Sequence, residues 1–295
     1  MRKITGLAVI ATLVAGQLAN AQEKTNNGLN PLSLRPIHES NVMYKTTLWR
    51  RIDLKEKQNQ PLFAKTSEIT KHLIEGVRAG VLEAYANDSL NTKLTLDQFN
   101  ERMAIKLDGG GLSDAEKEAG FSSTSDDGWG SGGDDGGKKE APAGGGAAPS
   151  TTASVANGME YFPSQLSILE LKEDFIFDKQ RSRQYNDILT LTIMIPADQN
   201  SEGLEKPLAS FKYKELERYF RSCNKCIWYN ASNVAQHKNL ADAFELRLFH
   251  GKIIKRSNAL DKYLDDIYKS PKQGMLKAQQ LEYELMEFEH NLWEY

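Results

Sequence analysis

LSILELKEDFIFDKQRSRQYNDILTLTIMI, residues 166–195, is the stretch from which the fold of this chain can be predicted. Two apolar runs rich in β-branched residues flank a polar turn region at 178–182, which is the pattern of an antiparallel hairpin. Both faces of the second arm are largely apolar, so other elements must cover it on both sides. We therefore predict a central hairpin in the middle of a small sheet, with helices packed against it.

The rest of the chain predicts helices on both sides of this hairpin and further strands after it. Capping residues and helical spacing of apolar residues mark the helices, and Thr95 with Gln98 matches a capping box. The expected fold class is α+β, with a small, mainly antiparallel sheet built on the hairpin and helices from both ends of the chain. The predicted helices cover residues 40–52, 67–85, 95–103, 214–220, 240–254 and 260–267 and a last segment after Pro271, and the predicted strands cover 208–213 and 226–229.

Composition divides the chain into five parts. Residues 108–158 hold 14 of the 22 glycines and few large apolar residues, so they cannot bury enough surface to offset their chain entropy. They predict a long disordered insertion, either a flexible linker or a segment that folds only against a partner. The expected parts are a signal peptide (1–21), a mobile lead-in (22–34), an N-terminal helical part (35–107), the Gly/Asp/Ser-rich linker (108–158) and a C-terminal α+β part (159–295).

The N-terminus has the features of a secretory signal. Arg2 and Lys3 precede a short apolar run that ends in small residues, which predicts cleavage between Ala21 and Gln22. The run is too short for a transmembrane anchor, and Gln22 is not the cysteine to which a lipid would be attached. We expect an exported protein that is soluble in the compartment it reaches.

The charge of the chain argues against one class of partner. Without the signal peptide and residues 108–158, the chain has 32 basic and 31 acidic residues. A body so nearly neutral has no electrostatic reason to bind nucleic acid. We expect no nucleic-acid partner.

Cys223 and Cys226 form the only two-cysteine motif and are the sharpest chemical candidates. A small structural disulfide is favoured, and free thiols or redox or metal chemistry are the alternatives. The pair follows a predicted helix, whereas a thioredoxin-like pair begins one. Zinc would need more ligands, and only His237 and His250 lie near in sequence, at no familiar spacing. No hydrolase or phosphate-binding motif is present, so we assign no catalytic, cofactor-binding or metal-binding residue.

Four segments, in order along the chain, resemble the GldN/PorN family of gliding-motility and type IX secretion proteins. Phe175 stands where much of that family has Trp, so an aromatic residue is kept. The segments are SNVMYKTTLWRRIDLKEKQNQPLF (40–63), EDFIFDKQRS (173–182), KRSNALDKYLDDI (255–267) and EHNLWEY (289–295).

The resemblance implies a non-enzymatic periplasmic assembly subunit of the type IX protein secretion and gliding machinery. It implies a ring-like complex with an outer-membrane lipoprotein of the GldK/PorK type, homo-oligomeric contacts within the ring, and a link to inner-membrane motor proteins. The subunit would lie at the inner face of the outer membrane and touch membranes only through its partners, without a cofactor. The alternative is a periplasmic thiol-disulfide enzyme or chaperone that uses Cys223 and Cys226.

Aromatic and charged residues are the candidates for the contacts of such an assembly, because binding energy concentrates in aromatic and arginine anchors. The charges at the hairpin tip suit an interface, a solvated turn or catalysis, and those at 50 and 51 suit either an interface or a solvated helix face. The candidates are Trp49, Arg50, Arg51, Asp178, Lys179, Arg181 and Trp228.

Overall fold

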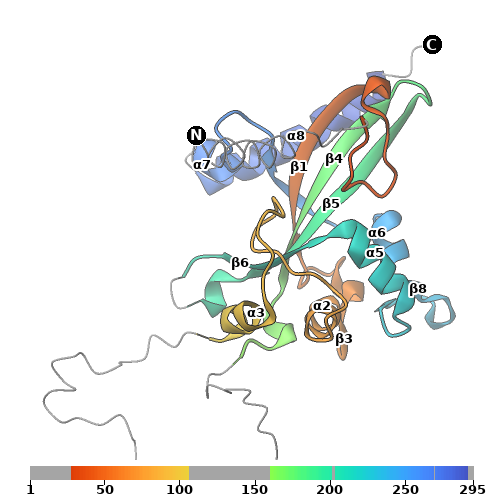
Figure 1. Ribbon diagram of the computed structural model, residues 1–295. Helices are drawn as coiled ribbons and strands as arrows, with labels where there is room; N and C mark the ends of the chain where they lie inside the picture. Colours follow the sequence, from red (N-terminus) through yellow and green to blue (C-terminus); the bar gives the residue numbers. More distant parts are fainter. Residues whose placement is uncertain (1–27, 106–159, 201–202, 269, 292–295) are drawn as a thin grey trace, which may run out of the picture.

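The computed structural model describes residues 28–105, 160–200, 203–268 and 270–291. Within them the fold is α+β, as predicted, and its centre is a five-stranded antiparallel sheet with the strand order β6-β5-β4-β1-β9 (Figure 1). The expected signal peptide with its cleavage site at Ala21 and Gln22, and the expected linker at 108–158, lie outside the described residues.

The predicted hairpin is formed by β4 (Ile168–Asp178) and β5 (Arg183–Ile195), and β4 is the middle strand of the sheet. Asp178 organises the turn between them: its Oδ1 accepts a hydrogen bond from the Gln180 amide at 2.8 Å, and its Oδ2 pairs with Arg181 Nη1 at 3.1 Å. Its side chain is fully buried, so Asp178 holds the turn and does not project from the tip.

Strand β1 (Val42–Asp53) corrects the helix predicted over residues 40–52. It pairs antiparallel with β4 from Val42↔Asp178 to Asp53↔Ile168, and with β9 on its other edge. The apolar residues of this segment fit helical spacing, but β-branched and aromatic residues also suit a pleated surface buried by its neighbours. Pairing with two distant strands therefore decides the conformation.

Two further helices are shorter than predicted. Helix α6 (Leu240–Glu245) ends before Arg247, whose φ of 54° breaks the helix, and the remaining segment becomes β9 (Lys252–Arg256) on the edge of the sheet. Helix α2 (Ile69–Arg78) ends near Gly80, whose φ of 70° suits glycine. The last seven residues of the helix predicted to reach Tyr85 therefore lie outside α2.

The other elements include three short strands that were not predicted, Phe63–Ala64, Ser67–Glu68 and Lys238–Asn239, and a helix that begins at Leu264, four residues later than predicted. The remaining ones lie close to their predicted positions, and the Thr95–Gln98 capping box is present. None of the helices in the described ranges combines the length and apolar character needed to cross a bilayer. These elements are β2 (Phe63–Ala64), β3 (Ser67–Glu68), α3 (Leu96–Met103), β6 (Lys206–Lys212), α5 (Tyr213–Ser222), β7 (Ile227–Trp228), β8 (Lys238–Asn239), α7 (Leu264–Tyr268) and α8 (Pro271–Asn291), with short 3-10 turns at Glu39–Asn41, Gln60–Leu62, Pro163–Gln165, Ala197–Gln199 and Val234–Gln236.

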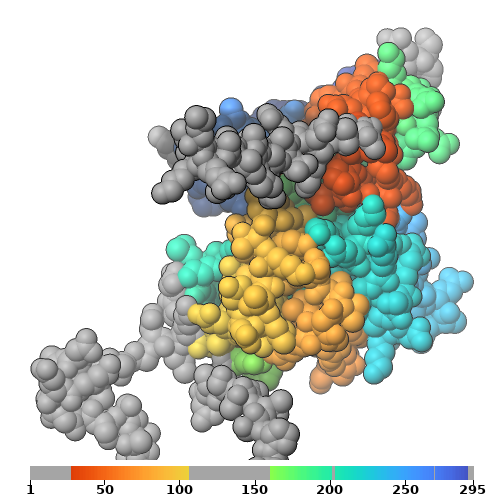
Figure 2. All heavy atoms as spheres, viewed as in Figure 1, coloured from red at the N-terminus to blue at the C-terminus, as the bar shows by residue number. Residues whose placement is uncertain are grey.

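Two apolar cores lie along the long strands. The larger core contains Ile52, Leu169 and Leu171 and is completed by residues of α2, α3, α5 and α6. The smaller core contains Leu48 and Phe175 and is completed by β9, α7 and α8. Figure 1 shows α7 and α8 beside one end of the long strands and α2 and α3 at the other, and Figure 2 shows the segments around α2, α3 and α5 packed side by side.

A buried ion-pair network separates these cores. The side chain of Glu173 on β4 has no exposed surface and accepts hydrogen bonds from Arg50 Nε and Arg247 Nη1, both at 2.6 Å. Arg50 also donates to the Gly251 carbonyl at 3.0 Å and to Glu282 of α8 at 3.1 Å. Burial alone would raise the pKa of Glu173, but Arg247 and Arg50 outweigh it and hold this pKa below its ordinary value.

We predict that Glu173→Ala lowers the free energy of unfolding by about 3 kcal/mol, because Arg247 loses its acidic partner and the half-buried Arg50 keeps only Glu282. Urea unfolding monitored by circular dichroism measures this change. Glu160→Ala is the matched control, since it removes only the exposed pair with Arg78 and should change stability by about 0.5 kcal/mol or less. Similar losses in both variants would contradict a structural role for the network.

Candidate functional site

Helix α8 carries apolar residues on two of its faces. One face packs into the smaller core through Leu281, Ala278, Leu285 and Phe288. The second face points to solvent. It starts at Met275, and the residues 8 and 11 positions later lie on the same side of the α-helix. We call this surface the α8 outer face; it consists of Met275, Leu276, Tyr283 and Met286, which are 64%, 58%, 55% and 62% exposed.

The α8 outer face has the features of a protein contact surface. Clustered exposed apolar side chains with a polar surround mark interaction sites on soluble proteins. The surround here includes Glu282, which pairs with Arg50, and Glu284, which pairs with Lys277 at 3.3 Å. Methionine and tyrosine are also enriched at interface centres. The sequence predicted a helix after Pro271, and its apolar residues follow two different spacings, one for the core face and one for the outer face.

The structure places Trp49 and Arg50 inside the body, so the exposure expected for them is wrong. Trp49 is 7% exposed, its Nε1 donates to Asp88 at 2.9 Å, and the Lys255 ammonium lies 4.4 Å from the centre of its ring. Arg50 has a side chain that is 14% exposed and bound to Glu173. Neither side chain is free to anchor a partner in this conformation.

The remaining predicted interface residues differ in accessibility. Lys179 and Arg181 are exposed at the hairpin tip, next to the buried Asp178. Arg51 has a side chain that is 37% exposed and pairs with Glu205 at 2.5 Å. Trp228 is partly buried against the larger core. The hairpin tip therefore offers two accessible cations, and an interface role for it stays a prediction.

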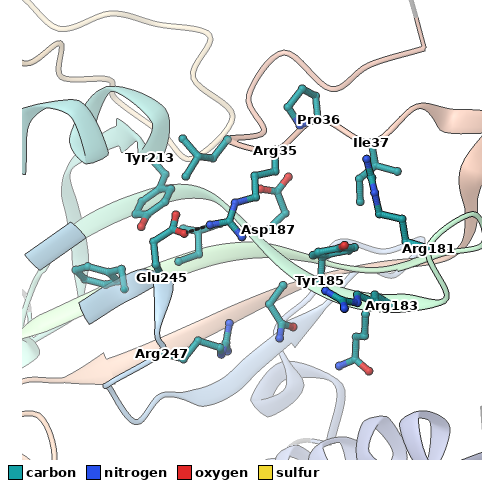
Figure 3. Close-up of a pocket in the computed structure, with 15 residues that line it drawn as sticks. Arg35, Pro36, Ile37, Arg181, Arg183, Tyr185, Asp187, Tyr213, Glu245 and Arg247 are labelled. Atoms are coloured by element: carbon teal, nitrogen blue, oxygen red, sulfur yellow. Dashed lines mark hydrogen bonds and ion pairs between the residues drawn. The ribbon is translucent and has the colours of Figure 1, made fainter. Parts of the chain in front are cut away.

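A hollow of about 600 Å³ lies between the hairpin, residues 34–37 and α6 (Figure 3). Residues 28–34, expected to belong to the lead-in, run close to the body, where Ser33 is 2% exposed. Arg35 reaches across the hollow to form an ion pair with Glu245 (Figure 3). The hollow could not be predicted from the sequence, because its lining comes from segments far apart in the chain.

The electrostatics of the hollow are dominated by arginines. Arg35, Arg181 and Arg247 already hold acidic partners, whereas Arg183 forms no ion pair within the described part of the chain. The Tyr213 hydroxyl is buried there without a hydrogen-bond partner among the described residues, and burial raises its pKa. Such a hollow can accept a carboxylate, because guanidinium groups bind carboxylates through paired hydrogen bonds.

A second charged cluster surrounds Glu170 on the opposite face of β4. Lys172 pairs with Asp88 at 3.1 Å, and Lys255, with a side chain that is 8% exposed, pairs with Asp261 at 2.6 Å. Glu170 itself is 9% exposed. Burial and the neighbouring charge of Asp88 raise the pKa of Glu170 to about 7, so this carboxyl titrates near neutral pH.

The two cysteines lie beside a histidine that sequence spacing did not connect to them. His72 of α2, Cys223 and Cys226 place their ligand atoms within 4.8 Å of one another, and both thiols are free in the structure. The predicted disulfide stays a prediction. Cys223 follows the C-terminal end of α5, and burial raises the pKa of the Cys226 thiol, whereas a nucleophilic cysteine needs a lowered pKa.

Comparison with known families decides the relationship that the four sequence segments suggested. A model of the family described as "Gliding motility associated protein GldN" matches residues 37–294. The chain belongs to this family. It is therefore a gliding-motility-associated protein, as the resemblance implied. A search among curated proteins found no match.

In this GldN-family chain, the segments that carried the resemblance meet in one part of the fold. Residues 40–63 contain β1, residues 173–182 contain the tip half of β4, and residues 255–267 join the end of β9 to α7. These three strands are neighbours in the sheet, and the smaller core fills the space between them and α8. The family pattern therefore marks the structural unit that holds α8 in place.

The raised pKa of Glu170 predicts how the stability of the GldN-family chain depends on pH. The protonated carboxyl favours the folded state, so its contribution is complete below about pH 4.5, where the unfolded chain titrates, and is lost as the pH rises through about 7. Glu170→Gln should therefore stabilise the protein relative to wild type by about 2 kcal/mol more at pH 8 than at pH 5. Urea unfolding at both pH values tests this.

Glu101→Gln is the control for this experiment, because Glu101 is an exposed residue of α3. Its effect should be the same at both pH values. A pH-independent effect of Glu170→Gln would show that the buried carboxyl does not titrate in this range.

Proposed function

We propose that this chain is a non-enzymatic periplasmic assembly subunit of the type IX protein secretion and gliding machinery. It forms a ring-like complex with an outer-membrane lipoprotein of the GldK/PorK type, contacts further copies of itself within the ring, and is linked to inner-membrane motor proteins. Membership of the GldN family supports this proposal. The α8 outer face is the structural observation that carries it.

The α8 outer face supports an assembly role because of its composition and its mounting. Its four apolar side chains would be desolvated together in a contact, and such clusters supply most of the binding energy of protein interfaces. Helix α8 is fixed to the sheet by the smaller core and by the hydrogen bond between Arg50 and Glu282. Because α8 is already held in place, less conformational entropy is lost when a partner binds to it.

The electrostatic features of the protein supply the second element of this proposal. Lys179 and Arg181 project from the hairpin tip, and the hollow beside the tip is lined by further arginines. Complementary charge contributes more to orientation and association rate than to affinity. We therefore assign affinity to the α8 outer face and alignment of the neighbouring subunit to the basic tip.

We predict that the double variant Met275→Lys/Met286→Lys weakens association with the lipoprotein partner by tenfold or more, since two desolvated positions would have to bury charge. The measurement is recovery of the lipoprotein, and the mass of the recovered complex, after affinity purification from detergent extracts of cells. Secretion and gliding should fail in the same cells, while the level of the variant chain stays near that of wild type.

Gln273→Lys is the matched control, because it adds a charge at an exposed position of α8 outside the outer face. It should leave the complex intact. Normal recovery of the lipoprotein and normal complex mass with the double variant would remove the α8 outer face from the assembly. Recovery of wild-type chain only as a monomer would contradict the assembly proposal itself.

A further inference from the structure

The cluster of His72, Cys223 and Cys226 joins two separate parts of the fold. His72 lies in α2, which precedes the hairpin, whereas both cysteines follow α5. Their ligand atoms lie within 4.8 Å of one another. His72 is 3% exposed, Cys226 has no exposed surface, and Cys223 is partly exposed at the edge of the cluster.

The backbone of residues 223–226 forms a tight turn. Helix α5 ends at Ser222, and the Cys226 amide donates a hydrogen bond to the Cys223 carbonyl at 3.2 Å. Cysteines separated by two residues in such a turn can direct both sulfur atoms to one ion, which is why this spacing recurs in zinc sites. The histidine needed beside them comes from the neighbouring helix.

Hydrogen bonds around His72 fix the protonation of its ring. Ser67 Oγ donates to the Lys225 carbonyl at 3.2 Å, so it accepts the proton of His72 Nε2, 3.1 Å away. Nδ1 then keeps a lone pair that can bind a cation. Metal-binding histidines commonly donate their second ring N–H to such an acceptor, which orients the ring. The Tyr219 hydroxyl also donates to the His72 carbonyl at 2.9 Å and ties α5 to α2.

We propose that His72, Cys223 and Cys226 form a zinc-binding site, with Ser67 as a positioning residue. Two sulfurs and one imidazole nitrogen are three of the four ligands of tetrahedral Zn²⁺, and water or the Glu75 carboxylate, 3.9 Å from His72 Nδ1, completes the fourth position. Binding forms two Zn–S bonds and one Zn–N bond. The two thiol protons pass to solvent, and no electrons are transferred.

The observed spacing is compatible with this ion after a small contraction. Zn–S bonds of about 2.3 Å and a Zn–N bond of about 2.0–2.1 Å place tetrahedral ligand atoms about 3.6–3.8 Å apart. Each pair of ligand atoms therefore has to approach by about 1.2 Å at most. Cys223 lies at the partly exposed edge and provides the path by which the ion enters.

A disulfide between Cys223 and Cys226 is the competing chemistry, because it would consume both sulfur ligands. A disulfide accounts for the two cysteines, but it gives no role to the buried imidazole, to its hydrogen bond with Ser67 or to the hydrogen bond from Ser67 to the Lys225 carbonyl. Zinc binding accounts for all of them. The site would tie α2 to the turn after α5, and this inference does not depend on the proposed assembly function.

The test uses the full-length protein purified from its native cells without chelators. We expect one equivalent of zinc by elemental analysis and two free thiols by mass spectrometry. The reduced, metal-free protein should then take up one equivalent of Zn²⁺ in competition with a chromophoric chelator. Bound Zn²⁺ should also protect Cys223, the partly exposed thiol, from alkylation under denaturant-free conditions, a measurement that needs no variant.

Variants separate the roles of the residues. Cys226→Ala should abolish stoichiometric zinc binding, and Ser67→Ala should weaken it by about 10- to 100-fold while leaving the stoichiometry at one, because Ser67 acts through His72. His290→Gln is the control, since His290 is an exposed residue of α8. It should bind zinc as wild type does. Thermal unfolding without metal checks that each variant is folded.

Any of three results would overturn the proposal. One is a fully formed Cys223–Cys226 disulfide without zinc in the protein from native cells, even if the reduced protein binds zinc afterwards. The others are failure of the reduced wild-type protein to bind one equivalent, and equal zinc binding by wild type and a folded Cys226→Ala variant.

Discussion

The buried contact of Glu173 with Arg50 and Arg247 is the constraint on which the arrangement of this fold depends. Glu173 lies on the middle strand between two apolar cores, and its arginines come from the neighbouring strand and from the loop that follows α6. Moving these charges out of water costs free energy. That cost is offset only when the charges pair in good geometry and their remaining hydrogen-bonding groups find partners. Arrangements that shift β1 or β9 relative to β4 would leave a charge unpaired, so this network favours a single register.

An element of this fold could be predicted from the sequence only where its signal was local. The hairpin and the capping box of α3 were predictable because their signals are local: alternating apolar residues in β4 and β5, and Thr95 with Gln98. Strand β1 was not, since its apolar spacing also suits a helix and its pairing partners lie far along the chain. Arg50 appeared to belong to a solvated face for the same reason, because its partner Glu173 belongs to another strand.

The candidate sites show the same limit. The second stripe of α8 was present in the sequence, but recognising it as exposed requires knowing that Leu281 and Phe288 occupy the core. The cluster proposed to bind zinc needed His72, which no motif spacing connects to Cys223 and Cys226, and the arginine hollow combines residues from separate segments. In each case a pattern identified the residue types, and only the packing of distant elements showed which of them meet.

The position of the Glu173 network between the cores links the internal packing to the proposed assembly surface. Arg50 binds Glu173 with Nε and Glu282 of α8 with Nη1, so one guanidinium group connects the middle of the sheet to the helix that carries the outer face. The smaller core fixes the opposite side of that helix. A helix held at both its core face and its polar edge presents its outer face in one orientation, and repeated assembly of identical subunits requires such a fixed orientation. The family segments at β1, β4 and β9 lie on neighbouring strands of the sheet around these contacts, so the residues that carry the family pattern are also those that hold α8 in this orientation.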